Sequence, residues 1–197
     1  MRELVIASGN EGKIAEISRA LKDAEIALRS LGDYCGVPLV EEDGQTYLDN
    51  AIKKAKSYSA FTEKMVLADD SGLEVDYLNG EPGVYSARYA GLNATDAENN
   101  RKLLRQLAGV TPDRRGATFR CILVLYEPDG SFHSFEGAWR GVITTEPAGE
   151  GGFGYDPLFY IPELGKTSAQ LDLDVKNHVS HRARALALLR EWFRRCR

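Results

Sequence analysis

Short apolar runs bounded by turn residues predict the strands of this chain. Runs of Val, Leu, Ile and aromatic residues favour strands, and Gly, Pro, Asn and Asp favour the turns between them. The predicted strands are residues 3–7, 65–68, 73–77, 117–126, 131–139 and 158–161. The turn Pro128-Asp129-Gly130 joins the strands at 117–126 and 131–139, which predicts a hairpin.

Apolar residues recur every three or four positions in other segments, which predicts amphipathic helices. The helices and their apolar positions are residues 14–21 (Ile14, Ile17, Leu21), residues 46–61 (Leu48, Ala51, Ile52, Ala55, Tyr58), the helix that begins at the capping box Thr95–Glu98 (Leu103, Leu104, Leu107) and the helix capped by Ser180 (Leu186, Leu189, Phe193). Strands in the middle of the chain with helices on either side predict a layered α/β or α+β fold. We expect one domain over residues 1–197.

Composition narrows the class of protein. The net charge of −4 argues against a general nucleic-acid binder, but permits a small anion in a local basic pocket. No apolar run approaches membrane-spanning length, and no signal peptide is expected because Met1 leads directly into a strand. Three widely spaced cysteines without a CxxC pair exclude a zinc ribbon and argue against a disulfide framework. We therefore expect a cytoplasmic protein with no nucleic-acid or membrane partner.

The turn Ser8-Gly9-Asn10-Glu11-Gly12-Lys13 lies between the first strand and the first helix. The free N–H groups of a helix N-terminus favour phosphate, glycine lets a phosphate approach the backbone, and Lys13 adds a positive charge. The spacing differs from that of a Walker A loop, because only two residues separate Gly9 from Gly12. An ordinary strand-to-helix turn explains the same residues equally well.

Asp69 and Asp70 follow the apolar run at 65–68 and precede Ser71-Gly72. We expect a buried strand that ends at these carboxylates and then turns, which would fix oxygen ligands for Mg2+. A surface turn is the simpler interpretation of the same four residues taken alone. Glu42, in an earlier acidic turn, is a further metal-ligand candidate or a solvated carboxylate.

Three lysines, Lys53, Lys54 and Lys56, lie on the helix predicted at 46–61. Such a run is usually solvated, so we expect solvent exposure for most of it. One of the three has room to turn toward a site at the edge of the apolar stripe.

A glycine-rich stretch, residues 149–157, contains a literal GxGxxG. The dinucleotide-binding interpretation is rejected, because that motif opens a helix and here Pro157 and a strand follow. Phe153 stands between glycines, and an aromatic ring on such a loop suits stacking against a planar base. The alternative is a bulged loop with Phe153 in the core.

A basic cluster of Lys176, His181 and Arg182 precedes or opens the last predicted helix. Positive charges at a helix N-terminus oppose the helix dipole, so an anion or a base acceptor would stabilise them. A solvated helix start is the alternative for each residue taken singly.

Six motifs together resemble one family. They are SGNEGK (8–13), EEDGQTYLDNA (41–51), ADDSGLEVD (68–76), GVYSARYAG (83–91), GEGGFGYDP (149–157) and SHR (180–182). In order and spacing they resemble the inosine triphosphate pyrophosphatase family, also called dITP/XTP pyrophosphatases. No motif position departs from the family pattern, and the variable stretches are residues 24–39 and 110–115.

The resemblance implies an elongated, two-lobed α/β domain with a long mixed β-sheet flanked by helices and a substrate cleft between the lobes. It implies a Mg2+-dependent homodimer that hydrolyses ITP, dITP and XTP to monophosphate and pyrophosphate and so cleanses the nucleotide pool. Asp70 would be the proton acceptor and, with Glu42, a metal ligand. The substrate contacts carried over are Ser8, Gly9, Asn10, Glu11, Gly12, Lys13 and Lys54 at the phosphates, Ser71, and Phe153, Gly154, Tyr155, Asp156, Lys176, His181 and Arg182 at the nucleoside.

The chemistry of these residues fits that reaction. Phosphoryl transfer depends on positioning and charge neutralisation, which lysines and Mg2+ supply. A donor such as Arg182 suits the 6-oxo group of hypoxanthine or xanthine and disfavours adenine, although GTP carries the same 6-oxo group. Two alternatives stay open: a pyrophosphatase for other modified nucleotides, and a nucleotide-sensing module without turnover.

Overall fold

Strand β1 (Arg2–Ala7) pairs in parallel with two neighbours in this computed structural model, which describes residues 2–196. Its partners are β2 (Ile26–Ser30) on one side and β3 (Met65–Val75) on the other. The other strands are β4 (Gly116–Tyr126), β5 (Phe132–Ile143), β6 (Phe159–Ile161) and β7 (Lys166–Thr167). The sheet has seven strands in the order β2-β1-β3-β4-β5-β6-β7, and β6 is antiparallel to both β5 and β7. The α/β class and the mixed sheet are therefore confirmed.

Residues 2–196 form five α-helices, and three of them begin at a side-chain cap. The five helices are α1 (Glu11–Ala20), α2 (Tyr47–Thr62), α3 (Asp96–Gln106), α4 (Leu173–Val179) and α5 (His181–Arg195). The side chains of Asn10, Thr46 and Thr95 each accept a hydrogen bond from the backbone N–H three residues later. The capping box predicted at Thr95 is confirmed. Within residues 2–196, no helix combines the length and the apolar character that crossing a membrane requires.

The chain divides into two compact units. Unit 1 comprises residues 2–70, 121–137 and 182–196, and unit 2 comprises residues 71–120 and 138–181. Strands β3, β4 and β5 each contribute residues to both units.

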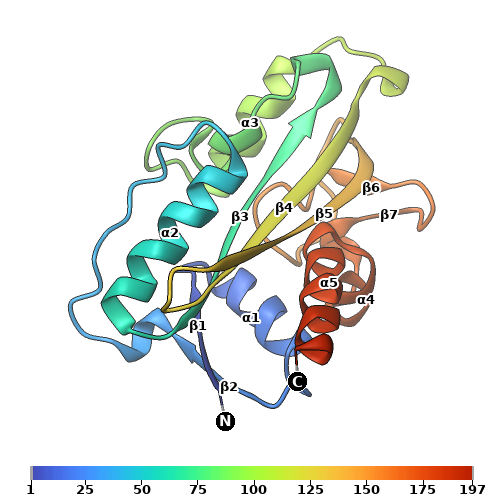
Figure 1. Cartoon of the computed structure of the whole chain (residues 1–197). Helices are drawn as coiled ribbons and strands as arrows, with labels where there is room; N and C mark the ends of the chain where they lie inside the picture. Colours follow the sequence, from blue (N-terminus) through green and yellow to red (C-terminus); the bar gives the residue numbers. More distant parts are fainter. Residues whose placement is uncertain (1, 197) are drawn as a thin grey trace. The chain divides into compact units, whose positions relative to one another are not determined.

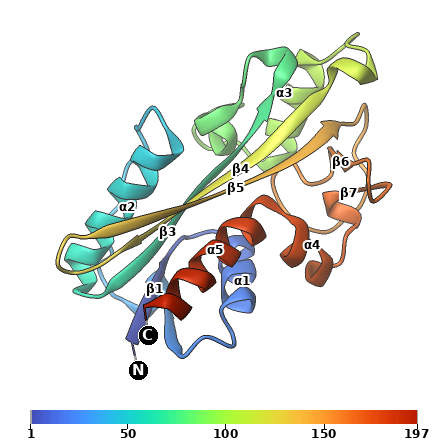
Figure 2. The same cartoon turned by 45° about the vertical axis from the view of Figure 1, so that its right-hand side comes forward.

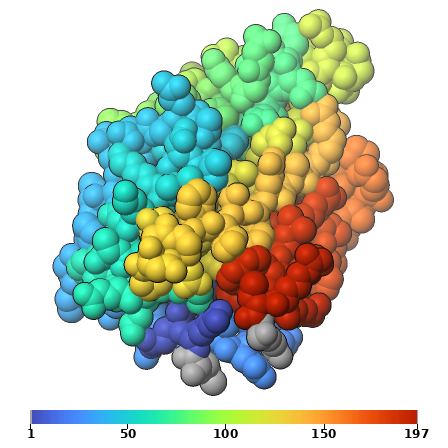
Figure 3. Space-filling model, viewed as in Figure 1, coloured from blue at the N-terminus to red at the C-terminus, as the bar shows by residue number. Residues whose placement is uncertain are grey.

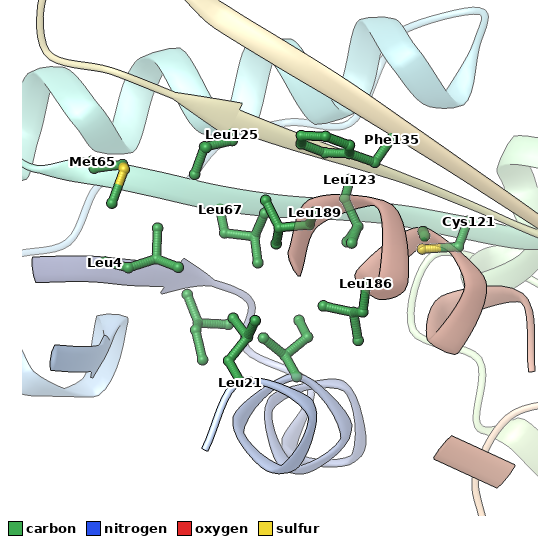
Figure 4. Close-up of a cluster of buried hydrophobic side chains, with 13 residues drawn as sticks. Leu4, Leu21, Met65, Leu67, Cys121, Leu123, Leu125, Phe135, Leu186 and Leu189 are labelled. Carbon is green, nitrogen blue, oxygen red and sulfur yellow. The ribbon is translucent and has the colours of Figure 1, made fainter. Parts of the chain in front are cut away.

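In unit 1 the sheet has helices on both faces (Figure 1, Figure 2). Alternate residues of a strand point to opposite faces, so β1 and β3 supply side chains to two separate cores. The core beneath α1 and α5, seen in Figure 4, contains Leu4, Ile6, Ile17, Leu21, Met65, Leu67, Leu186 and Leu189. The core beneath α2 contains Val5, Ala7, Ala51, Ala55, Val66 and Ala68. Residues 4–7 of β1 and residues 65–70 of β3 are thus buried on both faces of the sheet.

The β4–β5 hairpin is confirmed, with Glu127 N–H donating to the carbonyl of Ser131 across the turn (2.9 Å). Its tip, coloured yellow in Figure 3, lies at the surface. Asp129 and Gly130 are exposed there, which fits the turn chemistry of the sequence.

Unit 2 has its own apolar core. Aromatic and aliphatic side chains from β3, β4, β5, β6, the end of α3 and the glycine-rich loop form it: Leu73, Val75, Leu103, Leu107, Phe119, Trp139, Tyr155 and Phe159. Residues Gly83–Arg88, which no sequence pattern placed, form a 3-10 helix, and the Ser86 hydroxyl accepts from Leu73 N–H (2.9 Å) and donates to the Gly83 carbonyl (2.6 Å).

Three details of the sequence prediction were wrong. The strand predicted to end at residue 68 and turn at Ser71-Gly72 runs without interruption to Val75. Leu48, assigned to the buried stripe of α2, is exposed, whereas Asn50 and Lys54 on that helix are buried. No helix was predicted over residues 173–179, but these residues form α4, which contains Lys176 and precedes the last helix.

Candidate active site

The turn after β1 is held by its own side chains. Ser8 Oγ accepts from Asn10 N–H (3.1 Å), and Asn10 Oδ1 accepts from Lys13 N–H (3.0 Å). A side chain at Gly9 would have no neighbour within 4 Å among the described residues. Crowding within the fold therefore does not require glycine there, and the open space suits a ligand close to the backbone.

This turn lies beside the two aspartates because β1 and β3 are parallel neighbours. Ala7 pairs with Ala68, so the residues that follow each of them meet at the same edge of unit 1. The chain leaving β1 proceeds to β2, whereas the chain leaving β3 proceeds to β4 on the other side. Adjacent strands whose connections diverge in this way form the usual ligand position in open α/β sheets.

Asp69 and Asp70 face opposite sides of the sheet, because β3 continues through both. Asp69 follows Met65 and Leu67 toward α1 and α5, and Asp70 follows Val66 and Ala68 toward α2. The two carboxylates expected to form one acidic centre therefore have different partners.

Asp69 is the centre of a buried ion network. Its carboxylate accepts from the Lys13 ammonium and from Arg182 Nε (2.7 Å), and the Cys121 thiol lies 3.3 Å from Oδ2. Arg182 Nη1 also donates to the carboxylate of Glu16, which is buried on α1. Burial alone would raise the pKa of Asp69, but Arg182 and Lys13 outweigh it and hold that pKa well below 3.8.

Asp70 has a weaker set of partners on the other face. Lys54 Nζ lies 3.3 Å from Oδ1, and Asn50 Nδ2 donates to Oδ2 (3.2 Å). Burial is the largest influence on Asp70 and, with a hydrogen bond to Glu42, raises its pKa to about 6 despite the nearby lysines. Asp70 is thus a carboxylate whose pKa lies much closer to neutral pH than that of an ordinary aspartate.

Lys54 joins this carboxylate to the acidic turn. Its ammonium donates to the Asp69 carbonyl (2.8 Å) and lies 3.2 Å from Glu42 Oε1. Burial acts to raise the pKa of Glu42, but Lys54 and the bond to Asp70 lower it overall. As expected, most of this lysine run is exposed (Lys53 and Lys56), and the one lysine that turns toward the site is Lys54.

Glu42 and Asp70 are a suitable donor pair for Mg2+. This ion takes one or two carboxylates and completes its coordination with water and substrate phosphates. The Glu42 side chain is 38% exposed and the Asp70 side chain 7% exposed, so one ligand is accessible to solvent. No group of three or more His, Cys, Asp or Glu side chains that could hold a metal ion occurs in residues 2–196.

In unit 2, Asp156 organises the glycine stretch. Its buried carboxylate accepts from Phe153 N–H (2.9 Å) and from Lys176 Nζ (2.6 Å). Gly152 has φ +74°, and a side chain there would collide with Asp156. Lys176 Nζ lies 4.7 Å from the centre of the Phe153 ring. Phe153 is half-buried, so the interpretation of a ring packed fully in the core is not favoured.

Other residues of unit 2 fix the same loop. Asp96 accepts from Gly154 N–H (2.7 Å), and Asn100 Nδ2 donates to the Gly154 carbonyl (2.9 Å). The Tyr155 hydroxyl donates to the carbonyl of Ser86 (2.8 Å), and its burial raises the pKa of that phenol. Tyr155 is therefore a buried anchor of the loop.

His181, the first residue of α5, is buried in unit 2 and stacks on Phe119, with ring centres 4.8 Å apart. Sequence analysis grouped Arg182 with His181 and Lys176 at the nucleoside. In the structure, Arg182 instead bonds to Asp69 and Glu16 within unit 1. Ser71 follows Asp70 on β3 and is half-buried.

Sequence reasoning missed three polar residues of unit 1: Glu16, Asn50 and Cys121. Glu16 had a weak signal, because it lies three residues after Lys13 and so on the same helix face. Asn50 lies inside a quoted motif without an assigned role. Cys121 gave no signal, since β4 reads as an apolar strand.

Comparison with known proteins agrees with this architecture. The Ham1 family model matches residues 4–192. The chain is 53% identical to a dITP/XTP pyrophosphatase of Desulforamulus reducens (93% of this chain, 92% of the relative) and 52% identical to one of Geobacter sulfurreducens (97% and 96%). Its fold is similar to the solved Ham1 protein structures from Staphylococcus aureus (TM-score 0.88, 43% identity, all of both chains) and Coxiella burnetii (TM-score 0.87, 44% identity, 96% of each). The chain belongs to the Ham1 family.

Proposed function

We propose that this protein is a nucleoside-triphosphate pyrophosphatase that hydrolyses ITP, dITP and XTP to the monophosphate and pyrophosphate. The observation that carries the proposal is the buried Asp70 carboxylate, held between Lys54 and the Asn50 amide. The name of the similar curated proteins, dITP/XTP pyrophosphatase, supports the same substrates.

In the proposed reaction, Asp70 accepts a proton from the attacking water. A pKa of about 6 leaves this carboxylate mostly ionised at pH 7.5, yet makes it a better proton acceptor than an ordinary aspartate. Lys13 and Lys54 neutralise phosphate charge as pyrophosphate departs. Mg2+, held by Glu42 and Asp70, would add to that neutralisation and make a water easier to deprotonate.

The base of the nucleotide is the ligand that we propose for the residues around Phe153. Phe153 supplies an aromatic face, and Asp156 fixes both its backbone and the Lys176 ammonium. Lys176 is a donor that suits a 6-oxo group, which hypoxanthine and xanthine carry and adenine lacks.

Replacing Phe153 with leucine is expected to raise the KM for dITP about tenfold, with a smaller change in kcat. Stacking of a base on an aromatic ring contributes about 1–3 kcal/mol, which leucine does not supply. Steady-state kinetics measure the change, and Phe132→Leu in the exposed hairpin is the matched control. An unchanged KM would remove Phe153 from the substrate site.

Product analysis tests the proposed function. Purified protein is incubated with ITP, dITP, XTP, GTP, ATP or dTTP, with and without Mg2+, and pyrophosphate and orthophosphate are assayed separately. Pyrophosphate from the first three substrates, and none without metal, is the expected result. Orthophosphate would mean attack at the terminal phosphate, and tight binding without product would favour a sensing module.

We also propose that the protein is a homodimer in the cytoplasm. The family resemblance of the motifs supports the assembly, and a cysteine pattern that argues against a disulfide framework supports the location. A light-scattering mass equal to that of a single chain would contradict the dimer.

A further inference from the structure

We propose that Asn50 is a positioning residue for this reaction. Its amide ties the acidic turn that carries Glu42 to Asp70 on β3, and so sets the distance between the two carboxylates. The inference rests on the proposed function, since it explains how that site is held in place.

The Asn50 side chain bridges two segments that are distant in the sequence. It projects from α2 and is fully buried. Nδ2 donates to Asp70 Oδ2 (3.2 Å), and Oδ1 accepts from Gly44 N–H (2.7 Å). A primary amide carries a donor and an acceptor on one rigid plane, so a single side chain serves both partners.

The orientation of this amide follows from chemistry. The backbone N–H of Gly44 can only donate, so it must face the amide oxygen. The amide nitrogen then necessarily faces Asp70, which accepts in its ionised form. A flipped amide would place a donor against a donor and an acceptor against an acceptor.

Close packing of the turn against α2 is a second observation. A Cβ at Gly44 would lie 2.6 Å from Asn50 Oδ1 and 2.9 Å from the Asp49 Cβ. The backbone of the turn therefore approaches the helix more closely than any residue with a side chain allows. Glycine at position 44 lets the turn approach α2, and asparagine at position 50 holds it there by a hydrogen bond.

The other attachment of the turn at its surface is weaker. Lys53 pairs with Asp43, but both side chains are about half exposed, and such pairs contribute little. Lys54 also lies 3.2 Å from Glu42 Oε1, but this ion pair holds the carboxylate and not the backbone of the turn. The partly buried bond from Gly44 to Asn50 ties that backbone directly to α2. Without this bond, the Lys54 ammonium would remain as the link between Glu42 and Asp70, and the turn would be freer to move.

Three variants separate positioning from stability. Asn50→Leu removes the hydrogen bonds to Gly44 and Asp70 with a side chain of similar volume. Asn50→Asp keeps an acceptor for the Gly44 N–H but loses the donor to Asp70. Gly44→Ala displaces the turn and leaves the residues of α2 unchanged. The matched control is Ser59→Ala, which removes a buried bond from the same helix to the Lys64 carbonyl (2.8 Å) away from the site.

The measurements are kcat and KM for dITP, the urea midpoint, and hydrogen exchange of the Gly44 amide in the protein without substrate or metal. We expect kcat to fall at least about tenfold in all three site variants, because small displacements of catalytic groups have large effects. KM should change less than kcat. Exchange at Gly44 should be fast in Asn50→Leu and remain slow in Asn50→Asp.

Ser59→Ala should lower the urea midpoint and leave kcat within about twofold of the native value. Two results would overturn the inference alone: native kcat in the folded Gly44→Ala and Asn50→Asp proteins, or equally slow exchange at Gly44 in Asn50→Leu. A native protein that releases no pyrophosphate from any of the proposed substrates would overturn the proposed function itself.

Discussion

Asp70→Asn protein is expected to lose turnover by about a hundred- to ten-thousandfold and yet to unfold less readily than the native protein at pH 8. The loss follows from removing the proton acceptor. The stability effect follows from the pKa, which is about 6 in the folded protein against an ordinary value of 3.8. A raised pKa contributes stability that is present below pH 3.8 and is lost as the pH rises through 6.

Asparagine does not ionise, so the variant does not lose stability at this position as the pH rises. A shift of about two units corresponds to about 3 kcal/mol. The unfolding free energy of Asp70→Asn relative to the native protein should therefore rise by up to about 3 kcal/mol between pH 4 and pH 8. Urea unfolding in EDTA at several pH values measures the difference. Asp113→Asn, an exposed exchange of the same type, is the control, and parallel curves for Asp70→Asn and native protein would contradict the prediction.

Asp69→Asn should have the opposite effect on stability. Asp69 is the common partner of Arg182 and Lys13, and removing it leaves buried positive charge in excess. Breaking a buried pair in this way costs about 3–5 kcal/mol. Because the folded pKa of Asp69 lies well below 3.8, its contribution is present above that pH and is lost as the pH falls. The variant should thus be least stable, relative to the native protein, near neutral pH.

A double variant tests whether the network acts as a charged unit. Lys13→Met combined with Asp69→Asn leaves Arg182 paired with Glu16, which restores the charge balance. Its loss of unfolding free energy should be smaller than the sum of the two single losses. Additive losses, measured by urea unfolding at pH 7.5, would show that the ion pairs contribute independently.

The sequence predicted most elements of the fold because their signals are local. Periodic apolar residues and caps located α1, α2, α3 and α5, and the hairpin turn located β4 and β5. The continuity of β3 was not predictable in the same way, since Asp-Asp-Ser-Gly has the composition of a turn. Ion partners from α1, α2 and α5 compensate the buried charges there, and these partners are distant in the sequence.

The sequence identified most residues of the site but not the contacts that they make. The family resemblance singled out Asp70, Glu42 and Lys54, which the structure brings together. It did not indicate that Lys54 is buried while Leu48 is exposed, because the polar centre displaces the apolar stripe of α2 by part of a turn. The partners of Arg182 were also missed, since Glu16 is 166 residues away in the sequence.

The alternation of β3 gives strand register a direct role in the chemistry. A shift of this strand by one residue turns every side chain to the opposite face. Asp70 would then meet Arg182 and Lys13, and lose the proton affinity that a general base needs, while Asp69 would meet Lys54 and Asn50. The role of each carboxylate thus depends on which face of the sheet its position in β3 points to. The length of the segment before them, as much as the residues themselves, is therefore constrained by function.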